Sequence, residues 1–314
     1  MIRFKKALVT GGSGFVGRHM IDALVKRGVR PRVIDNFSCS SKASFKPYLS
    51  KVELVDGDIR DPKAVKRAVA GVDVVYHFAA IRSVVKSVED PMLSHEVNAT
   101  GALLLMHHAA QARVKHFIFT STSAVYGAAI AHKQHEDGEK RPMSPYGIAK
   151  LAAEYYAKYA TEALGLPTTS CRIFNVYGPR QNPESKYSLV VPGVMSKIVK
   201  HERPLIDGKG DQARDFVYIG DVVDAFLKMT GDRRAFGKIY NLGSGKATSI
   251  NTLVRTLLKL SGSPLVPVHG PRRPGDPDLT CADISKIKRE LGWAPKVDLE
   301  NGLKEAVLWY LNGK

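Results

Sequence analysis

The sequence of 314 residues has few cysteines and no long apolar run, and these absences exclude two classes of protein. Its three cysteines (Cys39, Cys171 and Cys281) lie far apart and form no CxxC motif, which favours a reducing, cytoplasmic setting without a disulfide framework. No uninterrupted apolar stretch is long enough to cross a bilayer. The basic N-terminus leads through a short apolar run into glycines, so residues 5–10 are interpreted as a first strand rather than a signal peptide.

Acidic residues are scarce relative to basic ones. Lysines and arginines number 47 against 30 aspartates and glutamates, which gives a formal net charge of +17. The basic residues are dispersed and form no block or arm. A generally charged surface is therefore the first explanation, binding of small anions the second and nucleic-acid binding the third. We expect no nucleic-acid partner.

Short apolar, β-branched runs alternate with amphipathic stretches in the first half of the chain, without any internal repeat. The runs lie at residues 5–10, 30–35, 51–56, 72–78, 115–121 and 167–174. Helix-like segments lie between several of them, at residues 17–28, 61–71 and 94–112. This alternation predicts right-handed βαβ units and an α/β fold with a doubly wound parallel sheet of Rossmann type, covered on both faces.

Prolines and glycines become frequent after about Gly178. Short helical stretches are predicted at 221–229, 250–260, 285–291 and 302–311, and residues 238–243 predict one further strand that returns to the first sheet. We therefore expect a Rossmann domain over residues 1–178 and a smaller mixed α/β lobe over residues 179–314. The ligand cleft should lie between them, beyond the carboxyl ends of the strands.

A glycine pattern follows the first expected strand, with Gly11, Gly14 and Gly17 in "TGGSGFVG". Glycines there let the backbone turn tightly and approach a pyrophosphate, whose charge the helix N-terminus favours. Asp35 ends the second strand at the spacing expected for a ribose 2′-hydroxyl contact, and it would repel a 2′-phosphate. The pattern predicts NAD rather than NADP as cofactor. The alternative is that Asp35 only caps a loop.

Two further strand ends supply weaker candidates for the same site. Asp58 and Ile59 follow the third strand and are candidates for adenine contacts, and Ala79 and Ala80 follow the fourth, where small residues can lie against a cofactor. Small and polar residues also occur at strand ends for packing. Their common placement at strand carboxyl ends is the stronger argument.

The fifth strand ends in "TSTSAVYG", and a helix-like segment then opens with "SPYGIAK". Pro145 is a natural first helical residue and Ser144 its cap, which places Tyr146 and Lys150 one turn apart. The pair could be neighbours on a solvated face, and Thr122 part of a Ser/Thr-rich turn. An ammonium beside a phenol also favours the phenolate, which lowers the tyrosine pKa from about 10. The trio then suits proton transfer at a carbon-bound hydroxyl during hydride transfer.

With these motifs the sequence resembles the extended short-chain dehydrogenase/reductases, and among them the UDP-glucose 4-epimerase-like nucleotide-sugar enzymes. The resemblance covers essentially the whole chain. It rests on "TGGSGFVG", "DN" at 35–36, "GDIRD", "HFAA", "TSTSAVYG", "YGIAK", "RIFNVYGPR", "GDQARDFVYIGDV" and "RRPGD".

The resemblance implies a role for each matching residue. Thr122, Tyr146 and Lys150 take the catalytic positions, with Tyr146 as base. Besides Tyr146 and Lys150, the cofactor-binding positions are Gly11, Gly14, Phe15, Val16, Gly17, Asp35, Asn36, Phe37, Ser38, Ser40, Asp58, Ile59, Phe78, Ala79, Ala80, Arg82, Asn98 and Phe174. The substrate-binding positions are Thr122, Asn175, Val190, Arg214, Arg273, Asp276 and Thr280. Of these, the two arginines would hold a diphosphate with their planar donor forks.

The residues after Thr122 bear on the reaction that the resemblance implies. Related nucleotide-sugar dehydratases carry an Asp-Glu pair there, whereas this chain has Ser123 and Ala124. C4 epimerisation of a UDP-hexose through a transient 4-keto sugar, with NAD regenerated in each cycle, is therefore favoured. Thr280 stands where some members place a bulky tyrosine, and its smaller volume leaves room for N-acetylhexosamines. Asp207 lies near the usual base-stacking aromatic, so a base other than uracil stays open.

Other interpretations stay open at this point. A nucleotide-sugar dehydratase or reductase using NAD(P) is one, and a non-catalytic dinucleotide-fold protein that binds RNA or a protein partner through its positive charge is another. The loop with His132, His135 and Glu136 is interpreted as solvated, and no metal is expected. The resemblance also implies a homodimer formed through helices near 92–112 and 144–164.

Overall fold

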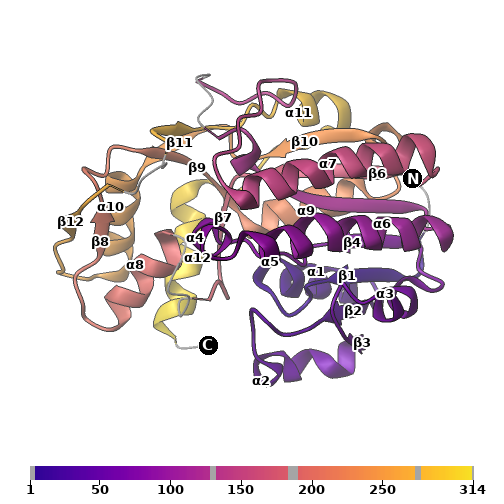
Figure 1. Ribbon diagram of the computed structural model, residues 1–314. Coiled ribbons are helices and arrows are strands. Elements are labelled where there is room, and N and C mark those ends of the chain that lie inside the picture. The colour runs from indigo at the N-terminus through magenta and orange to yellow at the C-terminus, as the bar shows by residue number, and fades with distance from the viewer. Residues whose placement is uncertain (1–3, 128–131, 183–189, 273–276, 313–314) are drawn as a thin grey trace.

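The computed structural model describes residues 4–127, 132–182, 190–272 and 277–312, and within them the largest element is a parallel sheet of seven strands (Figure 1). The strand order is β3-β2-β1-β4-β5-β6-β10. The strands are β1 (Ala7–Thr10), β2 (Arg32–Asp35), β3 (Glu53–Asp56), β4 (Val74–His77), β5 (His116–Thr122), β6 (Thr168–Ile173) and β10 (Lys238–Leu242). This order winds outward in both directions from β1 and β4, and it confirms the predicted Rossmann-type fold class.

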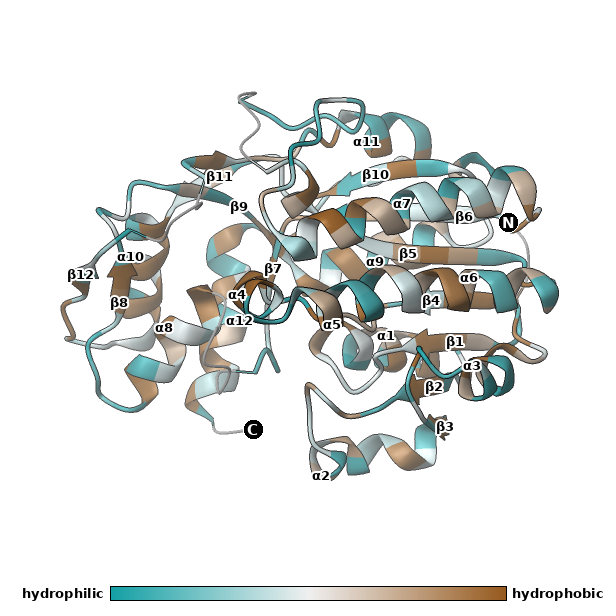
Figure 2. Ribbon diagram, viewed as in Figure 1, coloured by the Kyte–Doolittle hydropathy of each residue, from teal (hydrophilic) through white to brown (hydrophobic). Residues whose placement is uncertain are grey.

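Helices cover both faces of this main sheet. One face carries α3 (Pro62–Val69), α6 (Gly101–Gln111) and α7 (Pro145–Ala163), and the other carries α1 (Phe15–Val25), α9 (Ile219–Met229) and α11 (Ser285–Leu291). In β1, Leu8 packs with the first set of helices, whereas Ala7 and Val9 pack with the second. Successive strand side chains point to opposite faces, so one apolar run supplies both layers. Figure 2 shows β1 and β2 largely in the brown of hydrophobic residues, whereas the helices alternate between brown and teal.

The helix predicted over residues 94–112 is interrupted in the structure. It consists of α5 (Pro91–His95), a π-helical turn at Glu96–Thr100 and α6. Shorter elements nearby are α2 (Lys42–Phe45), α4 (Val84–Glu89) and 3-10 helices at Lys46–Lys51, Ser123–Val125 and Arg233–Ala235. The predicted start of α7 is confirmed, because the Ser144 side chain accepts a hydrogen bond from the Gly147 N–H.

The chain beyond Gly178 contributes to the main sheet as well as to a second group of elements. β10 joins the sheet edge by pairing in parallel with β6, so the predicted returning strand is confirmed. Helices α9 and α11, which the predicted boundary assigns to the second lobe, pack on the main sheet instead. The boundary at residue 178 itself stays a prediction.

The second group of elements surrounds strand β9 (Ala213–Tyr218), at the left of Figure 1. β9 pairs with β7 (Asn175–Tyr177), β11 (Ala247–Ser249) and β13 (Leu279–Thr280), and β8 (Leu205–Asp207) pairs with β12 (Val268–Gly270). Helices α8 (Val190–Val199), α10 (Ile250–Ser261) and α12 (Leu299–Leu311) pack against these strands around a separate apolar cluster. Among the described residues, no helix is long and apolar enough to span a bilayer.

Candidate active site

The main sheet changes winding direction between β1 and β4, and the carboxyl ends of these strands are tied together. The Thr10 hydroxyl accepts hydrogen bonds from the N–H groups of Phe78 and Ala79, each 3.1 Å away, and lies 2.7 Å from Nδ1 of His77. A switch point of this kind leaves a crevice beyond the strand ends, which is where open α/β sheets bind ligands.

The glycine-rich loop between β1 and α1 packs tightly against the backbone after β4 and against itself. Gly11 has a positive φ of 66°, and a Cβ at this position would lie 2.7 Å from the Ala79 nitrogen, so glycine is required. A Cβ at Gly17 would lie 2.3 Å from the Gly11 carbonyl oxygen, where α1 begins. Gly14, the N-cap of α1, has no side-chain cap, and a Cβ there would meet only the Gly11 oxygen. The uncapped N–H groups of α1 therefore fit a pyrophosphate.

Asp35 at the end of β2 fixes this loop from the neighbouring strand. Its Oδ2 accepts hydrogen bonds from the Ser13 N–H (2.9 Å) and the Ser13 hydroxyl (2.7 Å), and its Oδ1 accepts one from the Phe37 N–H (2.8 Å). Ser40 in turn contacts the Ser13 hydroxyl. Sequence reasoning missed Ser13, although its place inside the glycine motif, opposite the β2 acid, is the signal that could have found it.

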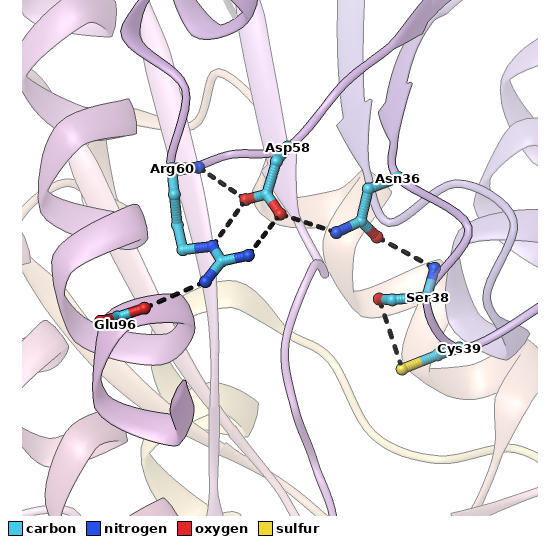
Figure 3. Close-up of polar contacts among 6 residues, drawn as sticks. All are labelled: Asn36, Ser38, Cys39, Asp58, Arg60 and Glu96. Atoms are coloured by element: carbon cyan, nitrogen blue, oxygen red, sulfur yellow. Dashed lines mark hydrogen bonds and ion pairs between the residues drawn. The ribbon is translucent and has the colours of Figure 1, made fainter. Parts of the chain in front are cut away.

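The segment after β3 meets the segment after β2 at the expected adenosine end of the site (Figure 3). Asn36 donates from Nδ2 to Oδ2 of Asp58 (2.8 Å) and accepts at Oδ1 from the Ser38 N–H (3.0 Å). Arg60 binds both Asp58 oxygens, at 3.0 and 2.9 Å, and this hydrogen bonding holds the pKa of Asp58 below its ordinary value. Ile59 is buried in the apolar layer. The structure thus brings Asn36, Ser38 and Asp58 together, and adds Arg60, which sequence reasoning missed.

The structure also brings the three predicted catalytic residues together. Thr122 ends β5, and its hydroxyl accepts a hydrogen bond from the Ala124 N–H (3.1 Å) and interacts with the Tyr146 hydroxyl. Lys150, one turn further along α7, is 2% exposed, and its ammonium lies 4.3 Å from the centre of the Phe119 ring. The pair is therefore not on a solvated face.

Burial dominates the electrostatics of this trio. It raises the pKa of Tyr146, while the Thr122 hydrogen bond and the charge of Arg82 oppose the rise. Burial lowers the pKa of Lys150 to about 7, and the carboxylate of Glu154 opposes that shift. The expectation that the Tyr146 pKa falls below its ordinary value is therefore wrong for the chain by itself. Loss of hydration disfavours the charged form of both groups, and it outweighs the hydrogen bond and the nearby charges that oppose it.

The remaining predicted cofactor residues differ in their contacts and in how far their side chains are buried. Phe78 and Asn98 contact other parts of the protein: the Phe78 ring packs on Phe226, and the buried Asn98 amide bonds the N–H and C=O of Ile81. Phe174 is buried beside Tyr126. Phe15, Val16, Ala79 and Ala80 are half-buried, as is Phe78, and Arg82 is exposed. Direct cofactor contacts for all of these residues stay predictions.

Three of the predicted substrate residues, Asn175, Arg214 and Thr280, meet at β9. Thr280 of β13 pairs in register with Arg214, and Asn175 of β7 donates to the Asp215 carbonyl (3.3 Å). Among the described residues the buried Thr280 hydroxyl has no hydrogen-bond partner. Val190 opens α8 and is half-buried. Arg273 and Asp276 lie outside the described residues.

Two buried carboxylates near these groups escaped sequence reasoning. Asp215, next to Arg214, accepts hydrogen bonds from the Ser244 N–H and hydroxyl and from the N–H groups of Gly245 and Ala282. It thereby fixes β9 to the chain on either side. Glu154 lies eight residues after Tyr146, and this spacing, which returns to the same helix face, could have revealed it.

The histidine loop is bonded to β10 and to the segment that precedes α11, and its ionisable groups do not gather around one point. His135 lies 3.2 Å from Asp283, whereas Glu136 is buried and accepts a hydrogen bond from the Asn241 N–H (2.9 Å). His132 is exposed. Within the described part of the chain no group of three or more potential ligands is arranged to hold a metal.

These strand-end loops and the Tyr–Lys helix define a class, the short-chain dehydrogenase/reductases, in which a dinucleotide lies across the switch point of the sheet. Residues 8–306 match the family model described as GDP-mannose 4,6 dehydratase. The chain belongs to this family of extended short-chain dehydrogenase/reductases, which includes nucleotide-sugar epimerases and dehydratases.

Similar proteins of this family include both epimerases and dehydratases. The chain is 32% identical over 324 residues to UDP-glucose 4-epimerase of Azospirillum brasilense, covering 97% of this chain and 91% of that protein. It is 34% identical over 320 residues to dTDP-D-glucose 4,6-dehydratase of Mus musculus, covering 98% and 88%.

Solved structures of similar proteins have the same fold throughout. UDP-glucose 4-epimerase of Thermotoga maritima, with UDP-glucose, has a TM-score of 0.93 at 35% identity over 98% of this chain and 99% of that one. UDP-N-acetylglucosamine 4-epimerase of Methanobrevibacter ruminantium, with UDP-N-acetylmuramic acid, has a TM-score of 0.94 at 32% identity over 100% of both chains. UDP-glucose 4-epimerase of Thermus thermophilus, with NAD, has a TM-score of 0.89 at 32% identity over 97% and 98%. The NAD complex agrees with the predicted cofactor, and the residues of this chain fit it.

Proposed function

We propose that this protein catalyses NAD-dependent C4 epimerisation of a UDP-hexose through a transient 4-keto sugar. The observation that carries the proposal is the Tyr146 hydroxyl, which interacts with Thr122 beside the buried Lys150, while Ser123 and Ala124 follow Thr122. A hydroxyl and an apolar side chain at those positions supply neither the acid nor the base that elimination of water requires. The names of the epimerase relatives support the same choice.

Tyr146 has to accept one proton and return it. The glycine loop and the β2 strand end would hold NAD, which would supply the acceptor and donor for the hydride at C4 of the sugar. Tyr146 Oη accepts the proton of the C4 hydroxyl and returns it to the same oxygen after the sugar has turned over. Because burial raises the Tyr146 pKa, acceptance depends on nearby positive charge, which Arg82 supplies and to which we propose that Lys150, one turn along α7, adds. The Thr122 hydroxyl, which accepts from the Ala124 N–H, donates its one proton to Tyr146 Oη and thereby favours the phenolate that takes the C4 proton.

The residues around β9 support the proposed substrate class. Arg214 lies at the centre of this group, and a guanidinium is suited to a diphosphate. We propose UDP-glucose and UDP-galactose as substrates and, because Thr280 is small, UDP-N-acetylglucosamine and UDP-N-acetylgalactosamine as further ones. The name of the Methanobrevibacter relative supports the acetylated pair.

Proton NMR of the protein incubated with UDP-glucose tests the proposal. We expect the anomeric signal of UDP-galactose to appear without net use of added NAD. A 4-keto-6-deoxy product would instead identify a dehydratase, and steady consumption of added NADH would identify a reductase. Either result, or the absence of turnover with a panel of UDP-, dTDP- and GDP-hexoses, contradicts the proposal.

We also propose that the enzyme is a homodimer. The neighbouring helices α4, α5 and α7 expose large apolar side chains, among them Val88 (63% exposed), Met92 (69%) and Tyr155 (64%). Such surfaces on globular proteins are commonly interfaces. Sedimentation equilibrium should give twice the chain mass for the protein and a monomer for Met92→Glu. A monomeric wild-type protein at micromolar concentration contradicts the proposal.

A further inference from the structure

A buried ion pair lies directly behind the catalytic trio. Arg172 of β6 donates from Nε and Nη2 to the two carboxylate oxygens of Glu154, at 2.9 and 2.7 Å, and both side chains are almost fully buried. The Ser121 hydroxyl donates to the same carboxylate. Ser121 immediately precedes Thr122, and Glu154 lies one turn after Lys150 on α7. The pair therefore connects the strand and the helix that carry the reacting groups.

The other end of Arg172 is fixed equally firmly. Its Nη1 donates to the Tyr126 hydroxyl (2.9 Å) and to the Glu136 carbonyl (2.8 Å), and the Tyr126 hydroxyl donates to Asn241 (2.7 Å). These bonds join β5, β6, β10 and α7. The position of the Glu154 carboxylate is thus determined from several elements at once.

Stability alone is a weak reason for such a pair, because two well-packed apolar side chains often serve a protein core as well. We propose that Glu154 is a positioning residue: its carboxylate, held by Arg172 and Ser121, keeps the buried ammonium of Lys150 charged beside Tyr146. This inference deepens the proposed function and rests on it.

The other ionisable groups near Lys150 do not supply that negative charge. The Thr10 hydroxyl accepts from two N–H groups, so its proton is donated to Nδ1 of His77. His77 is therefore neutral, with its proton on Nε2, and burial and the Lys150 charge lower its pKa. On the elements packed against α7, His95 and Glu96 are exposed, and Glu96 pairs with Arg60. Among the described residues, Glu154 is the carboxylate whose charge acts on the ammonium.

The direct test is an NMR titration of Lys150 in protein with isotopically labelled lysine, with the signal assigned by its loss in Lys150→Met. We expect a midpoint near 7 in the wild-type protein. Glu154→Gln keeps the shape but removes the charge, and should lower the midpoint by about one unit or more. Glu154→Asp keeps the charge and should leave the midpoint within a few tenths of a unit. Glu162→Gln, in an exposed ion pair on the same helix, is the matched control and should change nothing.

The pH profile of kcat provides a second readout, which a purely structural role would not change. With the Lys150 midpoint one unit lower, Glu154→Gln should lose about tenfold relative to wild type at pH 8 but less than about twofold at pH 5.5. Glu154→Asp should keep the wild-type profile. If Glu154→Gln does not fold, the double variant Glu154→Gln/Arg172→Met removes both charges at similar volume and should still lower the midpoint, by less than Glu154→Gln, because the opposing positive charge of Arg172 is lost as well.

An unchanged Lys150 midpoint in folded Glu154→Gln, or in the double variant, overturns the inference whatever the reaction is. A lowered midpoint in a protein that turns over no nucleotide sugar leaves the electrostatic part in place and contradicts the proposed function. A uniform loss of kcat at every pH, with Lys150 unshifted, would show that Glu154 acts only in folding.

Discussion

The catalytic centre and the substrate side of this protein are built differently. Thr122, Tyr146 and Lys150 come from one strand end and the first turns of the following helix. Asn175, Arg214 and Thr280 come from three strands that are far apart in the sequence and meet only by pairing around β9. The chemistry is thus encoded locally, whereas substrate recognition depends on long-range pairing.

The two regions also differ in how their polar groups are held. Behind the catalytic centre, Glu154 and Arg172 bond each other and their neighbours. On the substrate side, Asp215 is bonded as firmly, but the groups proposed to meet the substrate are not: the Asn175 amide makes a long bond of 3.3 Å, and the Thr280 hydroxyl lacks a hydrogen-bond partner among the described residues. We therefore expect substitutions at the catalytic centre to change turnover, and those around β9 to change affinity and selectivity.

The largest expected effect is that of Tyr146→Phe, which removes the proton acceptor and keeps the ring. Turnover of UDP-glucose should fall by about 10²–10⁴-fold, with thermal unfolding and retained NAD close to wild type. Steady-state kinetics together with the NAD content of the purified protein measure both. Near-wild-type kcat would remove Tyr146 from the base role.

Arg214→Ala tests the substrate side. Loss of a charged hydrogen-bonding group should weaken UDP-sugar binding by about 1.5–3 kcal/mol, or roughly 10- to 100-fold in KM, with a smaller change in kcat. Arg214→Lys should lie between the two, because an ammonium lacks the planar fork. The exposed Arg255→Ala on α10 is the control. A fall in kcat with KM unchanged would contradict the division between the two regions.

Thr280→Tyr sharpens the comparison within the substrate side. The added ring should lower kcat/KM for UDP-N-acetylglucosamine about tenfold relative to UDP-glucose, since steric exclusion acts on the larger sugar. Thr280→Ser keeps the volume small and should preserve the ratio. Equal losses for both sugars, or refusal of the acetylated sugar by the wild-type protein, would refute the volume argument.

The smallest functional effect is expected at the opposite end of β5, where His116 is buried. Its Nε2 donates to Thr169 (2.8 Å), whose hydroxyl donates to Ala235, while Nδ1 accepts from the Gly231 N–H (3.1 Å). The imidazole is therefore neutral, and burial lowers its pKa to about 3. The unfolded chain binds this proton near pH 6.5, so stability is complete above that pH and falls between pH 6.5 and 3.

His116→Asn should flatten this acid slope by about 1.4 kcal/mol per pH unit between pH 4 and 6, while changing kcat less than about twofold. Urea unfolding at several pH values measures the slope. An unchanged slope, or a large change in kcat, would show that the two ends of β5 are not independent.

The sequence predicts the six strands of the first half, the glycine loop and the catalytic trio, because these depend on local periodicity and spacing. It does not predict the π-helical turn at Glu96–Thr100. That turn contains Asn98, whose amide bonds the backbone of Ile81, and local periodicity does not reveal such a contact. The placement of α9 and α11 on the sheet, and the rise of the Tyr146 pKa, depend likewise on which surfaces tertiary packing covers. The position of Glu154 beside the catalytic residues could have been predicted from its helical spacing, but its pairing with Arg172 could not.

The most direct test of the central claim follows one deuterium atom. UDP-glucose deuterated at C4 is incubated with the protein in ordinary water, and the product is analysed by NMR and mass spectrometry. The account predicts UDP-galactose that retains the deuterium at C4, because the hydride leaves that carbon and returns to it without exchange. Loss of the label to solvent, or no epimer at all, would contradict the account.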